Sequence, residues 1–452
     1  MCRVQRFASV ATLVFAFLAA AVPFAHSLEK QPASVYHARR VALAARLRGG
    51  VAVLFAAEEP QLDFMPYRQD ADFYYLTGWN EPGAALLIVG EAPQAPAPRT
   101  YKEILFLPTR DLRMEKYTGA KLDAASSRVA ETAGVDGVEA MTALPAVLNQ
   151  LMDADRRLIH NVWTQPEAPQ ARALLGFTAV TLGVAASDSP HDVTELTGQL
   201  RAVKDEGEIA LLRKASDASI AGQLAMMRAA KPGVTERALA GEMTAVWMEK
   251  GCERASYAPI VGSGINSTIL HYSENSRTLA DGEVLLVDAA CEYSMYASDI
   301  TRTVPVNGHF TARQREIYNV VLGAQQAAID AFVAGKSKIN DRDRRDPDSL
   351  DNAAYNYINT HGRDLHGQPL GQYWLHGLGH LVGIDVHDPS DYPALLKPGS
   401  VFTIEPGVYI PEEKLGVRIE CVFLVGADGK LIDLVAALPH TAEDVEAAMQ
   451  GK

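Results

Sequence analysis

The chain has 452 residues, a length typical of two or three domains, and it is 48% hydrophobic and 21% charged. That composition excludes a collagen-like, an intrinsically disordered or a disulfide-dense small protein. The formal net charge of −13 argues against a nucleic-acid partner, because phosphate-backbone binding needs clustered lysine and arginine. The length allows a large buried core without disulfides or metals to hold it together.

The first 27 residues have the order of a secretory signal peptide. Arg3 and Arg6 precede an apolar run over residues 7–22, and the small residues Ala25 and Ser27 stand at the −3 and −1 positions of a cleavage site. An uncleaved membrane anchor is the alternative, but the run is shorter than the roughly 20 residues that span a bilayer. We predict an exported protein, periplasmic or secreted, cleaved near Ser27 and without a stable membrane anchor.

Cysteine is rare in this chain. Cys2 lies in the predicted signal peptide, and Cys252, Cys291 and Cys421 are far apart, with no CxxC pair. This spacing excludes a disulfide framework and a zinc ribbon. We expect buried free thiols, with one disulfide as the alternative in an oxidising compartment.

The first part of the mature chain alternates helices and strands. Apolar spacing predicts a helix over 34–48 that ends at a Gly-Gly pair. Buried strands are expected over 51–57, 85–89 and 103–107, with a proline-rich loop at 91–98. The alternation continues to about residue 185 and predicts an α/β domain over residues 28–200 that has no obvious catalytic cluster.

A polar break at 187–192 precedes the second part, which we assign to a domain over residues 201–452. It opens with a long helix that ends at Lys231-Pro232-Gly233, and it is otherwise rich in strands. Further helices are expected over 235–249 and 311–334, and strands over 283–290, 298–306, 400–410 and 416–425. Residues 336–366 carry the charge run DRDRRDPD and are interpreted as a solvated loop around a short helix near 352–360.

Acidic residues lie at the ends of apolar strands in this second domain. Asp288 ends LLVD and Asp299 lies near the start of SDITRT, so that a hairpin between them would bring the two carboxylates face to face. Two adjacent carboxylates repel unless a proton or a cation lies between them. Ordinary turn aspartates are the alternative at each position.

Three histidines follow within twelve positions. His376 and His380 lie in HGLGH, and His387 lies in DVHD. The first pair has the spacing of a zinc-protease HExxH helix, but Gly377 replaces the glutamate and two glycines disfavour a helix. An extended segment is expected instead, in which positions 376 and 380 share a face. A lone histidine is usually a packing residue, whereas three so close together indicate a functional site.

Two glutamates complete the acidic set. Glu405 ends FTIE, and Glu420 lies with Arg418 in the apolar strand GVRIECVFLV. A surface ion pair is the alternative for Arg418 and Glu420, but a charge among such neighbours needs a partner.

Taken together, the residues predict a dinuclear metal site. Two divalent cations balance the charge of four carboxylates, and the predicted ligands are Asp288, Asp299, His380, Glu405 and Glu420. Oxygen-rich ligation with one imidazole favours Mn²⁺, with Zn²⁺, Co²⁺ or Fe²⁺ as alternatives. Two such ions would lower the pKa of a shared water and give a hydroxide nucleophile near neutral pH.

These segments resemble a known family. HGLGHLVGIDVHD, SDITRTVPVNG, TIEPGVYI and VRIE are similar to motifs of the metallopeptidases with the pita-bread fold, which include aminopeptidase P, prolidase and methionine aminopeptidase. YRQDADFYYLTGWNEPGAALLIVG is similar to the non-catalytic domain of aminopeptidase P. The resemblance covers nearly all the mature chain. It implies an α/β (α+β) fold with a creatinase-like N-terminal α/β domain and a C-terminal pita-bread catalytic domain.

The resemblance also implies a role for each metal ligand. Asp288 would bind one metal, His380 and Glu405 would bind the other, and Asp299 and Glu420 would bridge both. Glu405 would in addition exchange a proton with the attacking water.

Accessory residues of the family have matches in this chain as well. His271, His376 and His387 match histidines that hold the substrate and stabilise charge or shuttle protons at the tetrahedral intermediate. Arg418 matches an arginine close to the ligands and to one end of the substrate.

The chain departs from the family pattern at three positions beside the ligands. Ala290 and Ser298 stand at positions where the family usually has glycine. Cys421 follows the motif RIE, where the family often has an acidic residue. None of these changes removes a ligand.

The implied activity is that of an Xaa-Pro aminopeptidase, acting on peptides with proline at the second position. Prolidase, which cleaves Xaa-Pro dipeptides, is the near alternative, and the N-terminal segment and export signal favour the aminopeptidase. An alternative of another class is a pita-bread binding module without catalysis, which the full ligand set disfavours. The resemblance further implies a homodimer or homotetramer.

Overall fold

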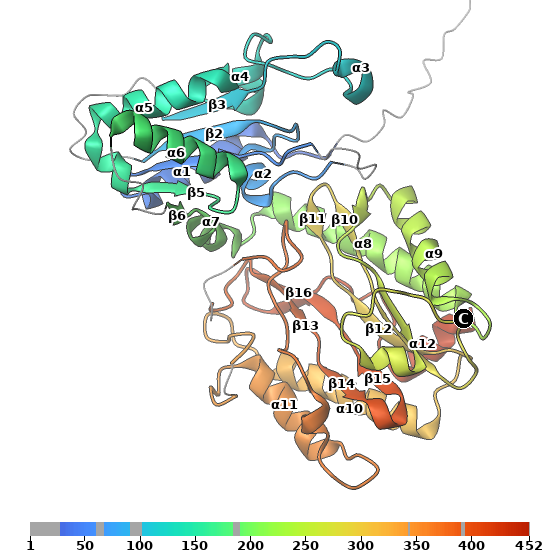
Figure 1. Ribbon diagram of the computed structural model, residues 1–452. Helices are drawn as coiled ribbons and strands as arrows, with labels where there is room; N and C mark the ends of the chain where they lie inside the picture. Colours follow the sequence, from blue (N-terminus) through green and yellow to red (C-terminus); the bar gives the residue numbers. More distant parts are fainter. Residues whose placement is uncertain are drawn as a thin grey trace, which may run out of the picture.

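The computed structural model describes residues 28–59, 67–90, 102–183, 190–341, 344–389 and 394–451. The predicted signal peptide and the proline-rich loop at 91–98 lie outside these ranges. Two domains follow one another along the chain, the first coloured blue to green and the second green to red (Figure 1). Within the described ranges, none of the helices is both long and apolar enough to cross a bilayer.

A mixed six-stranded sheet forms the centre of the N-terminal domain, in the order β4-β3-β2-β1-β5-β6. β2 runs antiparallel to β1 and β3, whereas β4, β5 and β6 pair in parallel with their neighbours. The strands are β1 (Val51–Phe55), β2 (Ala85–Val89), β3 (Glu103–Leu107), β4 (Gly137–Ala140), β5 (Val162–Thr164) and β6 (His191–Asp192). The helices are α1 (Ala33–Arg46), α2 (Ala71–Thr77), α3 (Glu115–Thr118), α4 (Val129–Ala133), α5 (Leu144–Ala154), α6 (Pro169–Leu182) and α7 (Thr194–Arg201).

Both faces of this sheet are covered, which explains the continuous apolar runs of its strands. Val53 of β1 packs in a core with side chains of α5 and α6, whereas Leu54 packs in a second core with side chains of α1 and α2. The predicted strands at 85–89 and 103–107 are confirmed, and the predicted helix at 34–48 is α1.

The C-terminal domain consists of small antiparallel sheets with long helices outside them (Figure 1). Its helices are α8 (Glu206–Ala229), α9 (Glu236–Glu249), α10 (Ala312–Ala331), α11 (Leu350–His361) and α12 (Ala442–Met449). The strands are β7 (Arg254–Ala255), β8 (Ile260–Ser263), β9 (Val284–Asp288), β10 (Cys291–Tyr293), β11 (Tyr296–Ala297), β12 (Thr301–Pro305), β13 (Val401–Ile404), β14 (Gly407–Ile410), β15 (Leu415–Arg418), β16 (Cys421–Val425) and β17 (Leu431–Asp433).

The predicted carboxylate ligands lie at the ends of paired strands of this domain. β9 lies between β8 and β12, and its last residue, Asp288, pairs with Thr301 of β12. β13 pairs with β16, and β14 with β15. The predicted helices and the strands at 283–290 and 298–306 are confirmed, with boundaries shifted by a few residues. The single strands predicted over 400–410 and 416–425 each divide into two, interrupted at Glu405 and at Glu420.

The interpretation of residues 336–366 as a solvated loop is only partly correct. α11 is longer than the predicted helix, and Leu350 and Asp351 at its start are buried. Its first turn is bound to the preceding chain, since the N–H groups of Leu350 and Asp351 donate to the carbonyls of Lys338 and Ile339. Apolar residues of the helix fix this segment against the core.

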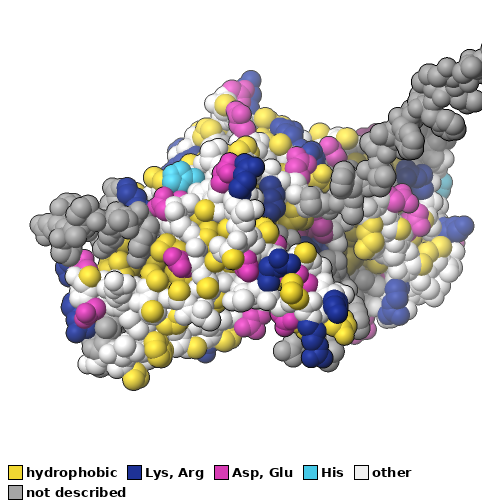
Figure 2. All heavy atoms as spheres, turned by 90° about the horizontal axis from the view of Figure 1, so that it is seen from above, with side chains coloured by type: hydrophobic (Ala, Val, Ile, Leu, Met, Phe, Trp, Pro, Cys, Tyr) yellow, Lys and Arg dark blue, Asp and Glu magenta, His cyan; other side chains and the backbone are white. Residues whose placement is uncertain are grey.

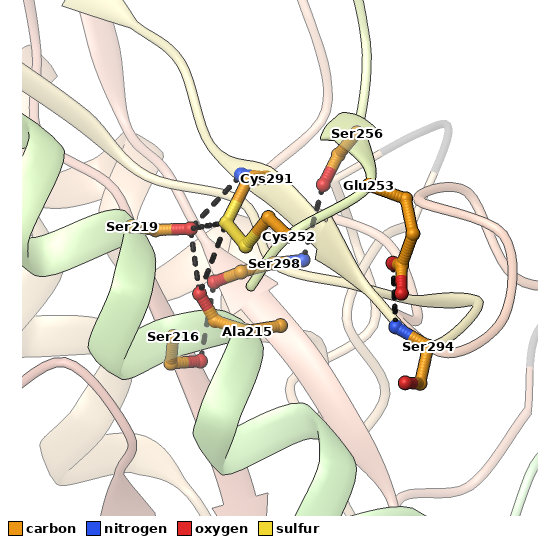
Figure 3. Close-up of a disulfide and its surroundings, with 9 residues drawn as sticks. All are labelled: Ala215, Ser216, Ser219, Cys252, Glu253, Ser256, Cys291, Ser294 and Ser298. Carbon is orange, nitrogen blue, oxygen red and sulfur yellow. Dashed lines mark hydrogen bonds between the residues drawn. A yellow bond between two sulfur atoms is a disulfide. The ribbon is translucent and has the colours of Figure 1, made fainter. Parts of the chain in front are cut away.

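The expectation of free thiols is wrong for two of the cysteines. Cys252 and Cys291 form a disulfide beside Ser219 of α8, with a Cα–Cα distance of 6.1 Å (Figure 3). Cys421 is a buried free thiol. The spacing in sequence could not show the pairing, because the fold brings the end of α9 against β10.

Charged side chains of both signs are interspersed on the face of the molecule seen in Figure 2. Among the described residues of that face, neither sign gathers into a continuous patch.

Candidate active site

Two aspartates meet at the ends of neighbouring strands. Asp288 ends β9 and Asp299 lies just before β12, and the hydroxyl oxygen of Tyr257 lies within hydrogen-bond distance of both carboxylates, at 2.5 Å and 2.6 Å. Both aspartates are largely buried. The predicted approach of the two carboxylates across the hairpin is thus confirmed.

The two glutamates come from the other half of the domain. Glu405 directly follows β13, and Glu420 lies between β15 and β16. Thr301 of β12 joins the halves, because its hydroxyl donates to Glu420 at 2.7 Å while its carbonyl accepts from the Glu420 N–H.

His380 lies between the acids of the two halves. Its Nε2 is 3.3 Å from Oδ2 of Asp299 and 3.5 Å from Oε1 of Glu405. Its Nδ1 bonds to the Leu381 carbonyl at 3.1 Å, so that Nδ1 carries the proton and Nε2 faces the acids. One ligand atom each from Asp299, His380 and Glu420 lies within 4.8 Å of the others.

The charge of this cluster fits divalent cations. Burial raises the pKa of Glu420 well above its usual range, and the charges of Asp299 and Glu405 add to the rise. Burial also raises the pKa of Glu405 to about 7, although His380 and Arg418 oppose it. Carboxylates with too little positive charge around them are suited to cations, which favour the ionised form.

Arg418 is the fixed positive charge of the site. Its guanidinium donates to Asp288 at 2.6 Å, to the Thr301 hydroxyl at 3.0 Å and to the Tyr409 hydroxyl at 2.9 Å. Since Arg418 and Glu420 are both buried, the surface ion pair considered from the sequence is excluded.

The accessory histidines lie near one another and near His380. His376 Nε2 bonds to the Tyr409 hydroxyl at 2.7 Å, and burial, with the charge of Arg418, lowers the pKa of His376 to about 4. The ring of His387 lies 3.8 Å from that of His380, centroid to centroid. His271 is exposed, and its charge is among the smaller causes, after burial, that lower the pKa of His376 and His387.

As predicted, HGLGH is not helical, but it is extended only in part: the chain bends at His376 and Leu378 and runs beside β13 from Leu378 onward. Close packing explains both glycines. An ideal Cβ on Gly379 would lie 2.2 Å from the Thr403 carbonyl oxygen, and one on Gly377 would lie 2.8 Å from Oδ1 of Asn340. His380 runs beside β13, where its carbonyl accepts from the Thr403 N–H. A zincin helix is therefore excluded.

The sequence does not predict two tyrosines of the site. Tyr257 and Tyr409 are uncharged, and their neighbours in sequence carry no signal of a functional site, so that only the fold reveals their contacts. Tyr409 lies in the quoted segment TIEPGVYI, which was the one available signal. The departures from the family pattern leave the ligands in place, and Ser298 bonds to Ser216 of α8.

Two buried glutamines occupy equivalent places behind the ligand strands. Gln223 of α8 donates from Nε2 to the carbonyls of Ala289 and Ile300, each the residue after a predicted aspartate ligand. Gln325 of α10 donates to the carbonyls of Ile404 and Ile419, each the residue before a predicted glutamate ligand. Each glutamine thus joins the backbones that carry one pair of carboxylates.

Comparison with known proteins agrees with this architecture. Residues 210–427 match metallopeptidase family M24, and residues 36–160 match the aminopeptidase P N-terminal domain. The chain is 33% identical to the Xaa-Pro aminopeptidase of Haemophilus influenzae, with 93% of this chain and 98% of that protein covered. It is also 33% identical to the Xaa-Pro aminopeptidase of Escherichia coli, with coverage of 92% and 97%.

Solved structures give the same result. The structure described as proline aminopeptidase P II from Yersinia pestis superposes with a TM-score of 0.80 at 30% identity. The match covers 93% of this chain and 100% of that one. Zinc-substituted E. coli aminopeptidase P in complex with product has a TM-score of 0.79 at 30% identity, with coverage of 94% and 99%.

The chain belongs to metallopeptidase family M24. It has an aminopeptidase P-type N-terminal domain followed by a pita-bread domain, and it is a metal-dependent aminopeptidase.

Proposed function

We propose that the protein hydrolyses the N-terminal Xaa-Pro bond of peptides with two divalent cations, most suitably Mn²⁺, at its active site. The observation that carries this proposal is the convergence of five residues from separate segments of the chain on one buried site: Asp288, Asp299, His380, Glu405 and Glu420. The names of its relatives support the proline specificity.

The five residues are proposed as the metal ligands. Asp288 would hold one ion, and His380 and Glu405 would hold the other. Asp299 and Glu420 would contribute to both. When bound, such ions supply Lewis-acid chemistry that activates water and polarises the scissile carbonyl. Arg418 fixes the orientation of Asp288, and Tyr257 holds Asp288 and Asp299 together.

The remaining residues would handle protons and charge. Glu405 would accept a proton from the attacking water and return it to the leaving amine, because a bound cation favours its ionised form. His376 is neutral near neutral pH, and Tyr409 and Arg418 hold its ring in place. We propose that His271, His376 and His387 line the substrate position and stabilise the charge that develops on the carbonyl oxygen.

The ligand assignment is tested by Asp299→Ala. We expect metal affinity and activity to fall by more than about 100-fold, because a shared ligand is lost. Asp217→Ala, on the exposed face of α8, is the matched control and should behave as the wild type. Full activity of Asp299→Ala would refute the dinuclear mechanism.

Substrate length separates the two enzymatic alternatives. With purified enzyme and Mn²⁺, we expect release of the first residue from Xaa-Pro-Yaa peptides, and little turnover of peptides that lack proline at the second position. Activity confined to Xaa-Pro dipeptides would instead identify a prolidase. A protein that binds no divalent ion at micromolar concentration would support the non-catalytic binding module.

We propose further that the protein is exported and cleaved near Ser27. The order of charges and apolar residues in the first 27 positions supports this, as does a disulfide, which persists in oxidising compartments. An intact mass that retains residues 1–27 after expression in an export-competent host would contradict it.

The assembly is proposed to be a homodimer or homotetramer, as the family resemblance implies. Light scattering coupled to gel filtration tests this, and a monomer at micromolar concentration would contradict it.

A further inference from the structure

Side chains of the stretch 336–366 reach the active-site backbone. Arg344 donates to the His376 carbonyl at 3.5 Å, and Asn340 makes two shorter hydrogen bonds. The carboxamide of Asn340 accepts a hydrogen bond from the Leu378 N–H and donates one to the Gly379 carbonyl, both at 2.6 Å. These backbone groups lie between His376 and His380. Asn340 therefore holds the chain that presents both histidines.

The hydrogen bonds continue on one side to His376. The peptide group whose N–H meets Asn340 also contains the Gly377 carbonyl, and this carbonyl bonds to Nδ1 of His376 at 2.7 Å. Because that partner can only accept, Nδ1 carries the proton and Nε2 accepts from the Tyr409 hydroxyl. Tyr409 in turn accepts from Arg418.

On the other side the hydrogen bonds continue to Glu405. The peptide group whose carbonyl accepts from Asn340 also contains the His380 N–H, which donates to the Thr403 hydroxyl at 3.1 Å. That hydroxyl donates to Oε1 of Glu405 at 3.3 Å.

All these hydrogen bonds run in one direction, from the guanidinium of Arg418 to the carboxylate of Glu405. Bonds in such a chain polarise one another, so that a donor-acceptor group in the middle affects both ends. A carboxamide is suited to that place because it accepts at Oδ1 and donates at Nδ2.

We propose that Asn340 is a positioning residue of the aminopeptidase, which links His376 to Glu405 through the backbone of residues 377–379. The inference rests on the proposed roles of His376, His380 and Glu405. It gives the stretch 336–366 a function, because the backbone hydrogen bonds between residues 338–339 and the start of α11 hold Asn340 in place. It also explains Gly377, since all three atoms nearest to an ideal Cβ there belong to Asn340, at 2.8, 3.1 and 3.3 Å.

The first test compares Asn340→Ala with Asn352→Ala. Asn352 lies in the same stretch, but its side-chain amide donates to the Asp346 carbonyl. Calorimetry measures the affinity for Mn²⁺, and kinetic assays with an Xaa-Pro-Yaa peptide at saturating Mn²⁺ measure kcat and KM. We expect Asn340→Ala to weaken Mn²⁺ binding and to lower kcat by about 10- to 100-fold with little change in KM, and Asn352→Ala to match the wild type. Unchanged Mn²⁺ binding and kcat in Asn340→Ala would overturn the proposal.

The second test is a double-mutant cycle with Gly377→Ala. Because the added Cβ meets Asn340, we expect Gly377→Ala to reduce kcat more in the wild type than in Asn340→Ala. Losses that simply multiply would contradict the proposal.

If Asn340→Ala does not fold, Asn340→Asp tests the proposal instead. The aspartate keeps the shape of the side chain and the acceptor for Leu378, but it has no donor for the Gly379 carbonyl. We therefore expect Mn²⁺ affinity and kcat to fall in this variant as well, and wild-type values would refute the proposal. Failure of the proposed function itself is distinguishable, because the wild-type protein would then bind no Mn²⁺ or would release no first residue from the Xaa-Pro-Yaa peptide.

Discussion

At the scale of single residues, buried amides hold the backbone beside the ligands. Gln223 and Gln325 are nearly inaccessible, and each gives two hydrogen bonds from one nitrogen to carbonyls next to predicted carboxylate ligands. A carbonyl that is buried without a donor destabilises the fold, because it has lost its hydrogen bonds to water. The two glutamines therefore contribute to stability and to the separation of the carboxylates.

Replacing these glutamines tests that contribution. We expect Gln223→Met and Gln325→Met each to lower the free energy of unfolding by about 1–3 kcal/mol, since shape is kept but the donor is lost. Urea denaturation of the metal-free protein measures the loss. Gln326→Met is the matched control, because Gln326 is exposed on α10 and donates to Asp330. Equal stability of all three variants would contradict the assignment.

The sequence predicts the charged residues of the site but not its uncharged polar ones. Asp288, Asp299, Glu405 and Glu420 were predictable because carboxylates in apolar strands need partners. The glutamines, Tyr257 and Asn340 were not, since uncharged polar residues occur in many solvent-exposed places.

At the scale of elements, the disulfide ties a helix to the hairpin between two ligands. Cys252 follows α9, and Cys291 opens β10, which lies between Asp288 and Asp299 in sequence. The N–H of Cys291 donates to the hydroxyl of Ser219 on α8 (Figure 3). The cross-link thus joins α9 to the strand that α8 also holds.

Reduction should weaken the C-terminal domain. The disulfide closes a loop over a sequence separation of 39, and we expect its loss in Cys291→Ser to lower the free energy of unfolding by about 2–4 kcal/mol. Chemical denaturation with and without reductant checks this. A reductant should destabilise the wild type but not Cys291→Ser, and equal effects on both would contradict the prediction.

At the scale of the whole molecule, buried ion pairs join the two domains at the loop that carries His387. Arg201 at the end of α7 pairs with Asp72 of α2 at 2.8 Å and with Asp388 at 2.6 Å, and Lys204 pairs with Asp388 at 3.0 Å. Arg201, Lys204 and Asp388 are all buried. The N-terminal domain therefore orients the loop next to the active site.

The ion pairs of Asp388 should make the free energy of unfolding decrease at acid pH. Burial alone would raise the pKa of Asp388, but the charges of Arg201 and Lys204 outweigh it and lower the pKa below its usual value. A lowered pKa means that the contribution is complete above the unfolded value of about 3.9 and is lost as the pH falls through the folded value.

The matching experiment uses Asp388→Asn. We expect this variant to be less stable than the wild type at pH 7 and the difference to shrink below about pH 4. There the unfolded wild-type chain takes up a proton at Asp388, while the folded protein, with its lowered pKa, takes it up only at lower pH. Urea midpoints across this pH range measure the effect. Asp428→Asn, at an exposed ion pair, is the control and should show no such trend. A difference that is independent of pH would contradict the prediction.

The sequence by itself determined the α/β class, most of the elements and the five acidic and imidazole residues, because apolar periodicity and buried charge are local properties of the chain. Only the tertiary structure decided which cysteines pair, which amides hold the ligand strands and what the stretch 336–366 contacts. Asn340 and Gly379 are 39 positions apart in sequence, as are Cys252 and Cys291. Uncharged contacts between such distant segments leave no periodicity in the sequence, and their partners are set by the packing of whole elements.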